Sequence, residues 1–322
     1  MTDTVTNARE AFAVTHNQNA LGHAEREAVL ANPGFGDHFT DHMVHIHWSA
    51  GDGWHSPRVA PFGPIQLDPS AGVLHYGQEI FEGLKAYRHG DGSIWAFRPE
   101  QNAARLQRSA RRMVMPELPA EYFLDSLKQL IAVDGAWVPS ATGTSLYLRP
   151  FMFAEEAFLG VRSAKSFAYY VIASPAGAYF TGGVSPVSIW LSDHWTRAGK
   201  GGTGAAKTGG NYAAGLLPQA EAYENGCAQV LFLDSVEGKY IEELGGMNVV
   251  LVHKDGTLIT PASGTILEGI TLASVLQLAR DRGHKVEQRP VTLEEWRNGL
   301  DSGDITEMFA CGTAAAITPI VK

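Results

Sequence analysis

The chain has 322 residues, of which 45% are apolar and 18% are charged, and its formal net charge is -9. The negative charge argues against a nucleic-acid-binding protein, which would present a basic surface. No apolar stretch approaches the roughly 20 residues that a membrane-spanning helix needs. Cys227 and Cys311 are the two cysteines and lie far apart in the sequence. A disulfide framework or a zinc cluster is therefore disfavoured, and we expect a cytoplasmic protein with reduced thiols.

The hydrophobic pattern predicts a protein of mixed α and β structure in two domains. In the first half it predicts helices at 101–113 and 120–133 and strands at 44–48, 93–97, 144–149 and 166–172. In the second half it predicts helices at 212–225 and 271–282 and strands at 187–191, 229–233, 240–243, 248–252 and 257–260. Proline and glycine punctuate the segment around 174–186. We therefore expect an N-terminal α/β domain at 1–175, an interdomain linker at 176–186 and a C-terminal domain at 187–322.

Lys207 lies in a glycine-rich segment, 201–212, and it is the one charged residue between positions 201 and 217. Glycine lets a chain turn sharply and pass close to a ligand. A lysine held away from carboxylates is a candidate for a lowered pKa and for a nucleophilic amine, as a Schiff-base lysine requires. The segment therefore predicts a catalytic lysine.

Two other interpretations of this segment stay open. Residues 201–208 resemble the phosphate-binding pattern G-x-x-x-x-G-K-[ST], although Ala206 replaces its second glycine. A loop of that kind follows a strand directly and opens a helix, whereas polar residues 192–200 intervene here. An exposed loop with an incidental lysine is the third interpretation.

Four further features suit a phosphorylated cofactor. Residues 267–271 run into a predicted helix, whose first N–H groups favour a phosphate, and Arg98 ends a predicted strand where it could clamp the same anion. Glu242 and Glu243 end another strand, and a carboxylate there could keep a pyridine nitrogen protonated. Small residues at 309–316 follow a strand and could present N–H groups to an anion. Each of these patterns also occurs as ordinary structure.

Four histidines, His38, His42, His45 and His47, lie close together in the sequence. His45 and His47 would share one face of a strand, which raises the question of a metal site. No cysteine and no second histidine pair at matching spacing accompanies them. We expect no metal and interpret them as surface histidines.

Taken together, these segments resemble the branched-chain amino acid aminotransferases, a family of fold-type IV pyridoxal phosphate enzymes. The resemblance runs from about Phe39 to Ile320, nearly the whole chain, and any one of its motifs alone would be weak. The motifs lie in order along the chain at Leu74–Tyr87, Phe97–Pro99, Leu146–Pro150, Gly204–Tyr212, Glu242–Asn248, Leu267–Thr271 and Cys311–Ala315.

The resemblance implies an α+β, two-domain fold with pyridoxal 5′-phosphate in the cleft between the domains. Lys207 would form the Schiff base with the cofactor. Tyr212 would hydrogen-bond the ring oxygen of the cofactor, and Glu243 would hydrogen-bond its pyridine nitrogen. The phosphate would be held by Arg98, by the backbone N–H groups of Ile270 and Thr271, and by the hydroxyl of Thr313.

The resemblance also implies how substrates bind. Tyr147 and the turn at Thr313 and Ala314 would receive the α-carboxylate. Phe81 and Tyr76 would line an apolar side-chain pocket. Arg149 would meet the second carboxylate of glutamate, at the rim of the pocket rather than on its apolar floor.

The implied activity is transfer of an amino group between branched-chain L-amino acids (Leu, Ile, Val) and 2-oxoglutarate by a ping-pong mechanism, in branched-chain amino acid biosynthesis. The alternatives are a D-amino acid or amine transaminase or a pyridoxal-dependent lyase of the same fold, and, more distantly, a phosphate-binding NTPase module. The family forms homodimers or larger assemblies, with Tyr76 near a subunit interface. No nucleic acid or membrane partner is expected. Family members usually continue for some tens of residues past the position of Lys322.

Overall fold

The computed structural model describes residues 10–177, 186–313 and 316–321. The chain divides into two compact units, a first unit of Met1–Ala178 and a second unit of Tyr179–Lys322. The predicted linker, 176–186, lies mostly outside the described residues, so the predicted domain boundaries stay a prediction. Among the described residues, none of the helices combines the length and the apolar character that a membrane crossing requires.

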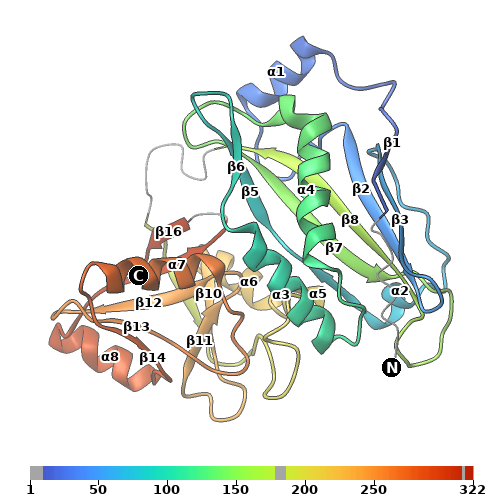
Figure 1. Cartoon of the computed structure of the whole chain (residues 1–322). Helices are drawn as coiled ribbons and strands as arrows, with labels where there is room; N and C mark the ends of the chain where they lie inside the picture. Colours follow the sequence, from blue (N-terminus) through green and yellow to red (C-terminus); the bar gives the residue numbers. More distant parts are fainter. Residues whose placement is uncertain (1–9, 178–185, 314–315, 322) are drawn as a thin grey trace, which may run out of the picture. The chain divides into compact units, whose positions relative to one another are not determined.

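The first unit is built on one eight-stranded sheet (Figure 1). Its strand order is β1-β3-β2-β8-β7-β5-β6, with β4 paired to β7 off this path. The pair of β1 and β3 is parallel, and the other described pairs are antiparallel. The strands are β1 (Ala13–Val14), β2 (His42–Ser49), β3 (Gly53–Pro61), β4 (Glu79–Phe81), β5 (Leu84–Arg88), β6 (Ile94–Ala96), β7 (Ser145–Ala154) and β8 (Ser166–Ala176).

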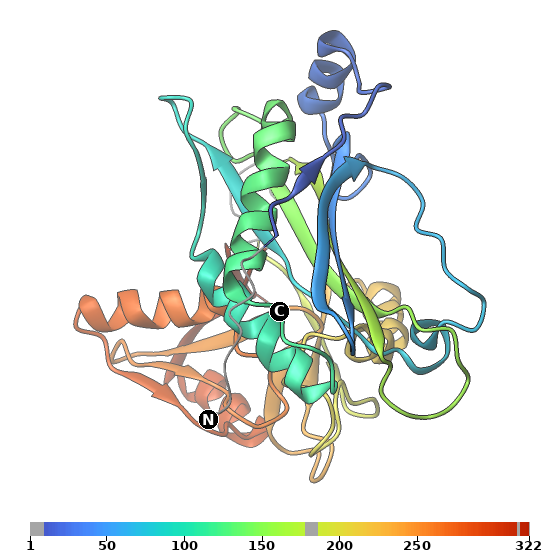
Figure 2. The ribbon, with the colours of Figure 1, turned by 45° about the vertical axis from the view of Figure 1, so that its right-hand side comes forward.

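Two long helices cover one face of this sheet, as Figures 1 and 2 show. In α3 (Pro99–Arg112) the buried apolar residues Ala103, Leu106 and Ala110 recur at helical spacing and face the core. In α4 (Ala120–Asp134) the buried Phe123, Leu127 and Leu130 follow the same rule. The shorter helices of the unit are α1 (His23–Ala31), α2 (Gly72–Tyr76) and the 3-10 turn η1 (Gly135–Trp137).

Strand alternation places the polar residues of the sheet on the opposite face. Along β7, Leu146 and Leu148 are fully buried in the core, whereas Tyr147 and Arg149 between and after them are half-buried. Because successive side chains of a strand point to opposite faces, Tyr147 and Arg149 lie on the face away from α3 and α4.

The second unit contains two sheets. A three-stranded sheet has the order β11-β10-β9, and a five-stranded sheet has the order β14-β13-β12-β15-β16. The strands are β9 (Ile189–Ser192), β10 (Gln229–Leu233), β11 (Ile241–Leu244), β12 (Asn248–His253), β13 (Leu258–Thr260), β14 (Val286–Gln288), β15 (Ile305–Gly312) and β16 (Ala316–Pro319).

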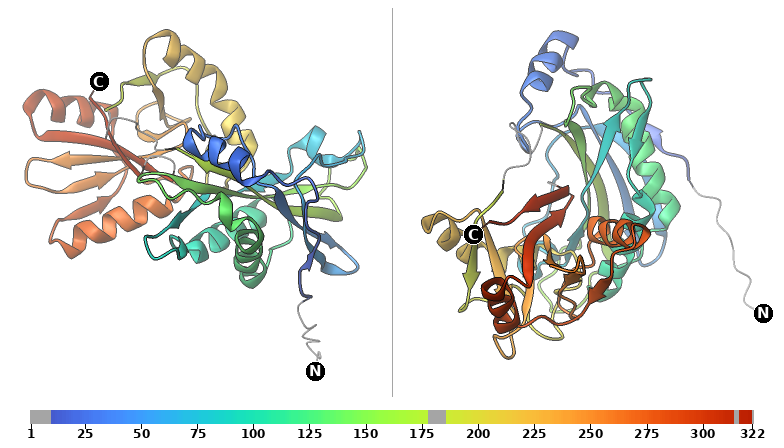
Figure 3. Two further views of the ribbon diagram at one scale, coloured as in Figure 1. Left: turned by 90° about the horizontal axis from the view of Figure 1, so that it is seen from above. Right: turned by 90° about the vertical axis from the view of Figure 1, so that its left-hand side faces the viewer.

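The main core of the second unit joins both sheets, with residues such as Leu231, Leu244 and Val249 in one apolar cluster. Helices α7 (Ile270–Asp281) and α8 (Leu293–Ser302) lie on opposite sides of the five-stranded sheet, which Figure 3 shows in orange and red. Helix α6 (Leu216–Glu224) packs on the three-stranded sheet through Ala222. The predicted helix at 212–225 is wrong as one helix, because α5 (Gly209–Ala214) and α6 are separate and meet at Gly215.

Candidate active site

Lys207 lies in the loop between β9 and α5, and its side chain is half-buried. Its Nζ donates a hydrogen bond to the Tyr212 hydroxyl at 2.6 Å and lies 5.1 Å from the centre of the tyrosine ring. Tyr212 belongs to the short helix α5, which starts after the loop. The glycine-rich segment 201–212 does not follow β9 directly, because residues 193–200 lie between the end of β9 at Ser192 and this segment. A phosphate-binding NTPase loop, in contrast, follows its strand directly.

Asn211 holds the Lys207 loop in its shape. Its buried amide donates to the carbonyl oxygens of Thr203 (2.9 Å) and Ala206 (2.8 Å). The Thr203 hydroxyl donates back to the Asn211 side-chain oxygen at 2.7 Å. These hydrogen bonds close the loop just before Lys207. They therefore hold the backbone from which the Lys207 side chain extends.

Gly204 lets this loop approach another segment closely. A Cβ atom at this position would clash with the carbonyl oxygen of Thr265 and would contact the Cβ of Ala198 at 2.8 Å. The glycine is therefore required by close backbone packing, not by a positive φ angle. It joins the Lys207 loop to the segment that leads into α7.

Glu243 is a buried carboxyl group on β11, with 4% of its surface exposed. It accepts a hydrogen bond from the Leu267 backbone N–H at 2.9 Å and is ion-paired with Arg197 at 2.8 Å. Burial raises the pKa of Glu243 to about 7, although Arg197, the Leu267 N–H group and Lys207 all lower it. A carboxyl group with such a pKa can hold or release a proton at neutral pH, which suits contact with a basic nitrogen.

Helix α7 begins next to this carboxyl group. Its N-cap residue, Gly269, provides no side-chain cap, so the first-turn N–H groups of Ile270 and Thr271 are not capped by it. The Asn248 amide donates to the Leu267 carbonyl at 3.0 Å, and a Cβ atom at Gly269 would clash with the Asn248 side-chain oxygen. An uncapped helix start of this kind favours an anion.

The second unit thus brings Lys207, Tyr212 and Glu243 together with the start of α7. Thr313 is half-buried and directly follows β15. Ala314 lies outside the described residues.

The first unit brings three of the predicted substrate residues into contact. Arg149 Nη2 donates to the Tyr147 hydroxyl at 2.9 Å. The guanidinium carbon of Arg149 lies 4.8 Å from the centre of the Phe81 ring and 5.3 Å from that of the Tyr147 ring. Arg149 Nε is buried and has no hydrogen-bond partner among the described residues. The cluster therefore combines aromatic surface with a donor that needs an acceptor.

Three residues around this cluster were not assigned a role from the sequence. Phe35 packs edge-on against Tyr147, with ring centres 5.2 Å apart. Lys85 is the register partner of Tyr147 on β5, and burial lowers its pKa. At Gly83 a Cβ atom would clash with the Tyr147 hydroxyl. Strand pairing is the signal that could have identified Lys85, because residues opposite one another in adjacent strands share a face of the sheet.

Tyr76 and Arg98 belong to two other elements of the first unit. Tyr76 ends α2, is 41% exposed and donates its hydroxyl hydrogen bond to the Leu159 carbonyl. Arg98 is the exposed N-cap residue of α3 and has a left-handed backbone, with φ of 50°. A non-glycine residue in this region is strained, and such strain often accompanies a functional position.

The histidines divide between the two faces of the sheet. The interpretation as surface histidines is wrong for His42, which is buried because it pairs with Asp134 at 2.7 Å, whereas His38 is exposed. On the other face, His47 lies within hydrogen-bonding distance of both His45 (3.3 Å) and Glu155 (3.2 Å). Burial lowers the pKa of His45 to about 4. Across residues 10–177, 186–313 and 316–321, no three His, Cys, Asp or Glu side chains are arranged to hold a metal ion.

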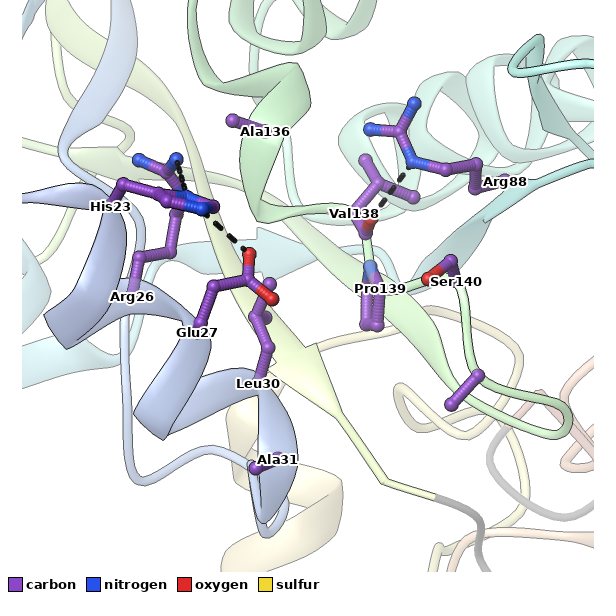
Figure 4. A pocket seen from close by; sticks show the side chains of 11 residues that line it. His23, Arg26, Glu27, Leu30, Ala31, Arg88, Ala136, Val138, Pro139 and Ser140 are labelled. Carbon is purple, nitrogen blue, oxygen red and sulfur yellow. Dashed lines mark hydrogen bonds and ion pairs between the residues drawn. The ribbon is translucent and has the colours of Figure 1, made fainter.

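The pocket drawn in Figure 4 contains none of the predicted site residues. It has a volume of about 440 Å³ and lies in the first unit, lined by α1 and by residues 136–141. Two of its charged side chains have partners within the unit: Arg88 Nε donates to the Val138 carbonyl at 3.1 Å, and His23 lies 3.8 Å from Glu27. Arg26 Nε is buried without a hydrogen-bond partner among the described residues. Because no predicted site residue lines it, we assign this pocket no role in the site.

The pKa of Glu243 predicts a stability difference that depends on pH. The folded cofactor-free chain holds the Glu243 proton up to a pKa of about 7, whereas the ordinary pKa of a glutamate is 4.5. Stability is therefore lost as the pH rises through this window, by at most about 1.4 kcal/mol per pH unit. Glu243→Gln should lack this loss and gain thermal stability relative to the natural chain as the pH rises.

Thermal unfolding of both cofactor-free proteins across this pH range checks the prediction. Glu294→Gln, which removes an exposed carboxylate on α8, is the control and should follow the pH dependence of the natural chain. Parallel curves for the natural chain and Glu243→Gln would contradict it.

The fold and these clusters can be compared with known proteins. Residues 79–322 match the family model described as amino-transferase class IV. A branched-chain-amino-acid aminotransferase of Mycolicibacterium smegmatis is 60% identical over 314 residues, which are 96% of this chain and 85% of the relative. The Mycobacterium tuberculosis protein of the same name is 59% identical over 316 residues, 97% of this chain and 86% of that protein.

Solved structures agree with these sequence matches. The branched-chain aminotransferase of Thermoproteus uzoniensis, solved with norvaline, has a TM-score of 0.72 at 27% identity and covers 87% of each chain. The Escherichia coli branched-chain amino acid aminotransferase has a TM-score of 0.70 at 28% identity, over 85% of each chain. The Thermobaculum terrenum branched-chain amino acid aminotransferase, solved in its PLP form, has a TM-score of 0.70 at 27% identity, over 87% of this chain and 84% of that one.

Proposed function

Because this chain belongs to amino-transferase class IV and, within it, to the branched-chain-amino-acid aminotransferases, we propose that Lys207 is the residue that bonds pyridoxal 5′-phosphate and moves the substrate proton. The fold-type IV class predicted from the motifs is confirmed. The comparisons do not favour a D-amino acid transaminase, a lyase or an NTPase module. The observation that carries the assignment is the hydrogen bond from Lys207 Nζ to the Tyr212 hydroxyl at 2.6 Å, close to the buried Glu243.

The residues of the second unit fit the chemical parts of this cofactor. Its aldehyde suits the Lys207 amine and its ring oxygen suits the Tyr212 hydroxyl. Its pyridine nitrogen suits the Glu243 carboxyl group, whose burial limits competition from water. Its phosphate suits the start of α7, where the N-cap residue Gly269 offers no side-chain cap, and we assign Thr313 to the same anion; Arg98 stays a predicted phosphate ligand.

Bound pyridoxal phosphate supplies an electron sink for the Cα carbanion of an amino acid. Lys207 contributes an amine that removes the Cα proton and carries it until it is returned later in the transfer. Tyr212 accepts a hydrogen bond from that amine and so orients it. Glu243, held by the Leu267 N–H group, keeps a carboxylate at the position where a ring nitrogen carries its proton.

The Phe81, Tyr147 and Arg149 cluster is the proposed substrate side of the site. An apolar branched side chain would contact Phe81 and Tyr76, and the Tyr147 hydroxyl would meet the α-carboxylate. The Arg149 guanidinium lies over the Phe81 and Tyr147 rings, and the second carboxylate of glutamate or 2-oxoglutarate would pair with its charge. Both substrates would then use the same α-carboxylate contact in turn, as ping-pong kinetics requires.

We further propose that the chain forms a homodimer or a larger assembly in the cytoplasm. The hydroxyl bond from Tyr76 to Leu159 places two exposed apolar segments side by side, with Leu74 57%, Leu159 63% and Val161 89% exposed. Exposed apolar groups of this kind mark interaction surfaces. Both cysteines are free thiols, as a reducing compartment would keep them. Analytical ultracentrifugation tests the assembly.

Lys207→Ala should abolish transamination while the fold is kept. The change removes both the covalent partner of the cofactor and the proton carrier, so the rate should fall by more than about a hundredfold. Borohydride reduction followed by mass spectrometry should place the cofactor on the Lys207 peptide of the natural chain and nowhere on the variant. Lys200→Ala, an exposed lysine of the same loop, is the control and should retain activity and labelling. Substantial turnover by Lys207→Ala without an added amine would overturn the assignment.

Arg149→Gln should separate the two substrate classes. It removes the charge assigned to the second carboxylate, so the KM for 2-oxoglutarate should rise roughly thirtyfold, about 2 kcal/mol, while that for leucine changes little. Tyr147→Phe is the matched variant: it removes the hydroxyl that Arg149 contacts and should weaken both substrate classes. Equal losses for both substrates in Arg149→Gln would show that Arg149 serves the α-carboxylate or the fold instead.

A further inference from the structure

Arg197 is a buried arginine in the loop after β9, and none of the predicted roles includes it. Its side chain is 5% exposed. We propose that Arg197 is a positioning residue, whose guanidinium holds the Glu243 carboxylate, the Lys207 loop and the segment before α7 in one arrangement.

Three acceptors from three separate segments converge on this guanidinium. Its Nη2 lies 2.8 Å from Glu243 Oε1 and donates to the Gly204 carbonyl at 3.2 Å and to the Thr265 carbonyl. Gly204 lies three residues before Lys207, and Thr265 lies two residues before Leu267, whose N–H group binds Glu243. One side chain therefore connects the Glu243 carboxylate, the Lys207 loop and the segment before α7.

The local packing leaves no room for these segments to move closer together. Ala198, next to Arg197, and the Thr265 carbonyl both lie against the position where a Cβ of Gly204 would stand. Arg197 Nε is buried without a hydrogen-bond partner among the described residues. Burying a donor without a hydrogen-bond partner costs free energy. The other contacts of the Arg197 guanidinium must therefore offset this cost.

Arg197 also supplies a permanent charge among groups that titrate. Glu243 faces Arg197, Lys207 and the neighbouring Glu242, and Glu242 in turn faces Arg197 and Asp234. Burial raises the pKa of both glutamates, and Arg197 lowers both. Lys207 must lose its proton to act as a nucleophile, whereas a guanidinium stays charged at every working pH. Arg197 therefore favours the ionised form of Glu243 even when Lys207 is neutral.

This inference rests on the proposed cofactor site, but one of its consequences does not. If Arg197 controls the ionisation of Glu243, its loss changes the titration of that carboxyl group in the cofactor-free chain as well. The titration and the cofactor affinity are therefore measured separately, so that a wrong cofactor site and a wrong role for Arg197 give different results.

The test uses the full chain with Arg197→Met, Arg197→Lys and, as control, Arg289→Met. Arg289 is paired with Glu287 and Glu295 in the second unit and belongs to none of the assigned contacts. The Glu243 carboxyl carbon is followed by ¹³C NMR in cofactor-free protein, with Glu243→Gln identifying its signal. The dissociation constant of pyridoxal 5′-phosphate is measured by absorbance titration.

Arg197→Met should raise the pKa of Glu243 by about one unit or more and weaken cofactor binding by about tenfold or more. Arg197→Lys should keep the pKa close to that of the natural chain, because the charge stays, but should still weaken binding severalfold, because an ammonium does not reproduce the guanidinium contacts. Arg289→Met should change neither quantity.

An unchanged Glu243 pKa in Arg197→Met would overturn the proposal, whatever happens to affinity. A raised pKa with unchanged affinity would instead support the control of Glu243 by Arg197 but overturn the assignment of Glu243 to the cofactor. If Arg197→Met fails to fold, Arg197→Lys decides: cofactor binding as in the natural chain would overturn the role of the guanidinium contacts.

Discussion

A buried carboxylate needs compensating charge and hydrogen bonds. For Glu243, the carboxylate and its partners come from three segments of the second unit. Strand β11 supplies the carboxylate, the loop after β9 supplies Arg197, and the segment before α7 supplies the Leu267 N–H group. Breaking one partner of such a pair leaves an uncompensated buried charge, which costs several kcal/mol. The geometry around Lys207 is therefore a property of the folded unit rather than of the glycine-rich segment alone.

The first unit differs in that one face of its sheet carries both apolar surface and positive charge. Tyr147 and Arg149 share that face because they are two residues apart on β7, and the core residues Leu146 and Leu148 point the other way. The guanidinium of Arg149 lies over aromatic rings instead of beside a carboxylate, so its charge is not cancelled by a protein group in the described cluster. Such a surface can accept either an apolar group or an anion.

What could be predicted from the sequence was local. The Lys207 loop, the helices at α3, α4 and α7 and the pair Tyr147 and Arg149 all follow from short patterns of glycine, of helical spacing or of strand alternation. The break between α5 and α6 at Gly215 was missed because the apolar pattern runs through it. Arg197 was missed because its partners are distant in the chain: the Thr265 carbonyl is 68 positions away. No periodic pattern marks a residue whose role is set by three tertiary contacts.

Gly83 limits how the proposed substrate surface can change over evolution. A side chain at this position would collide with the Tyr147 hydroxyl, so the wall beside Tyr147 does not thicken by a single substitution without displacing the tyrosine. Phe81, two positions earlier, is a large side chain beside the Arg149 guanidinium, and a shorter residue there would leave more room. In the proposed site, a single mutation at Phe81 can therefore make room for bulkier substrates, whereas a single mutation at Gly83 cannot narrow the site for smaller ones. Laboratory selection for altered substrate range would be expected to accumulate changes at Phe81 while retaining Gly83.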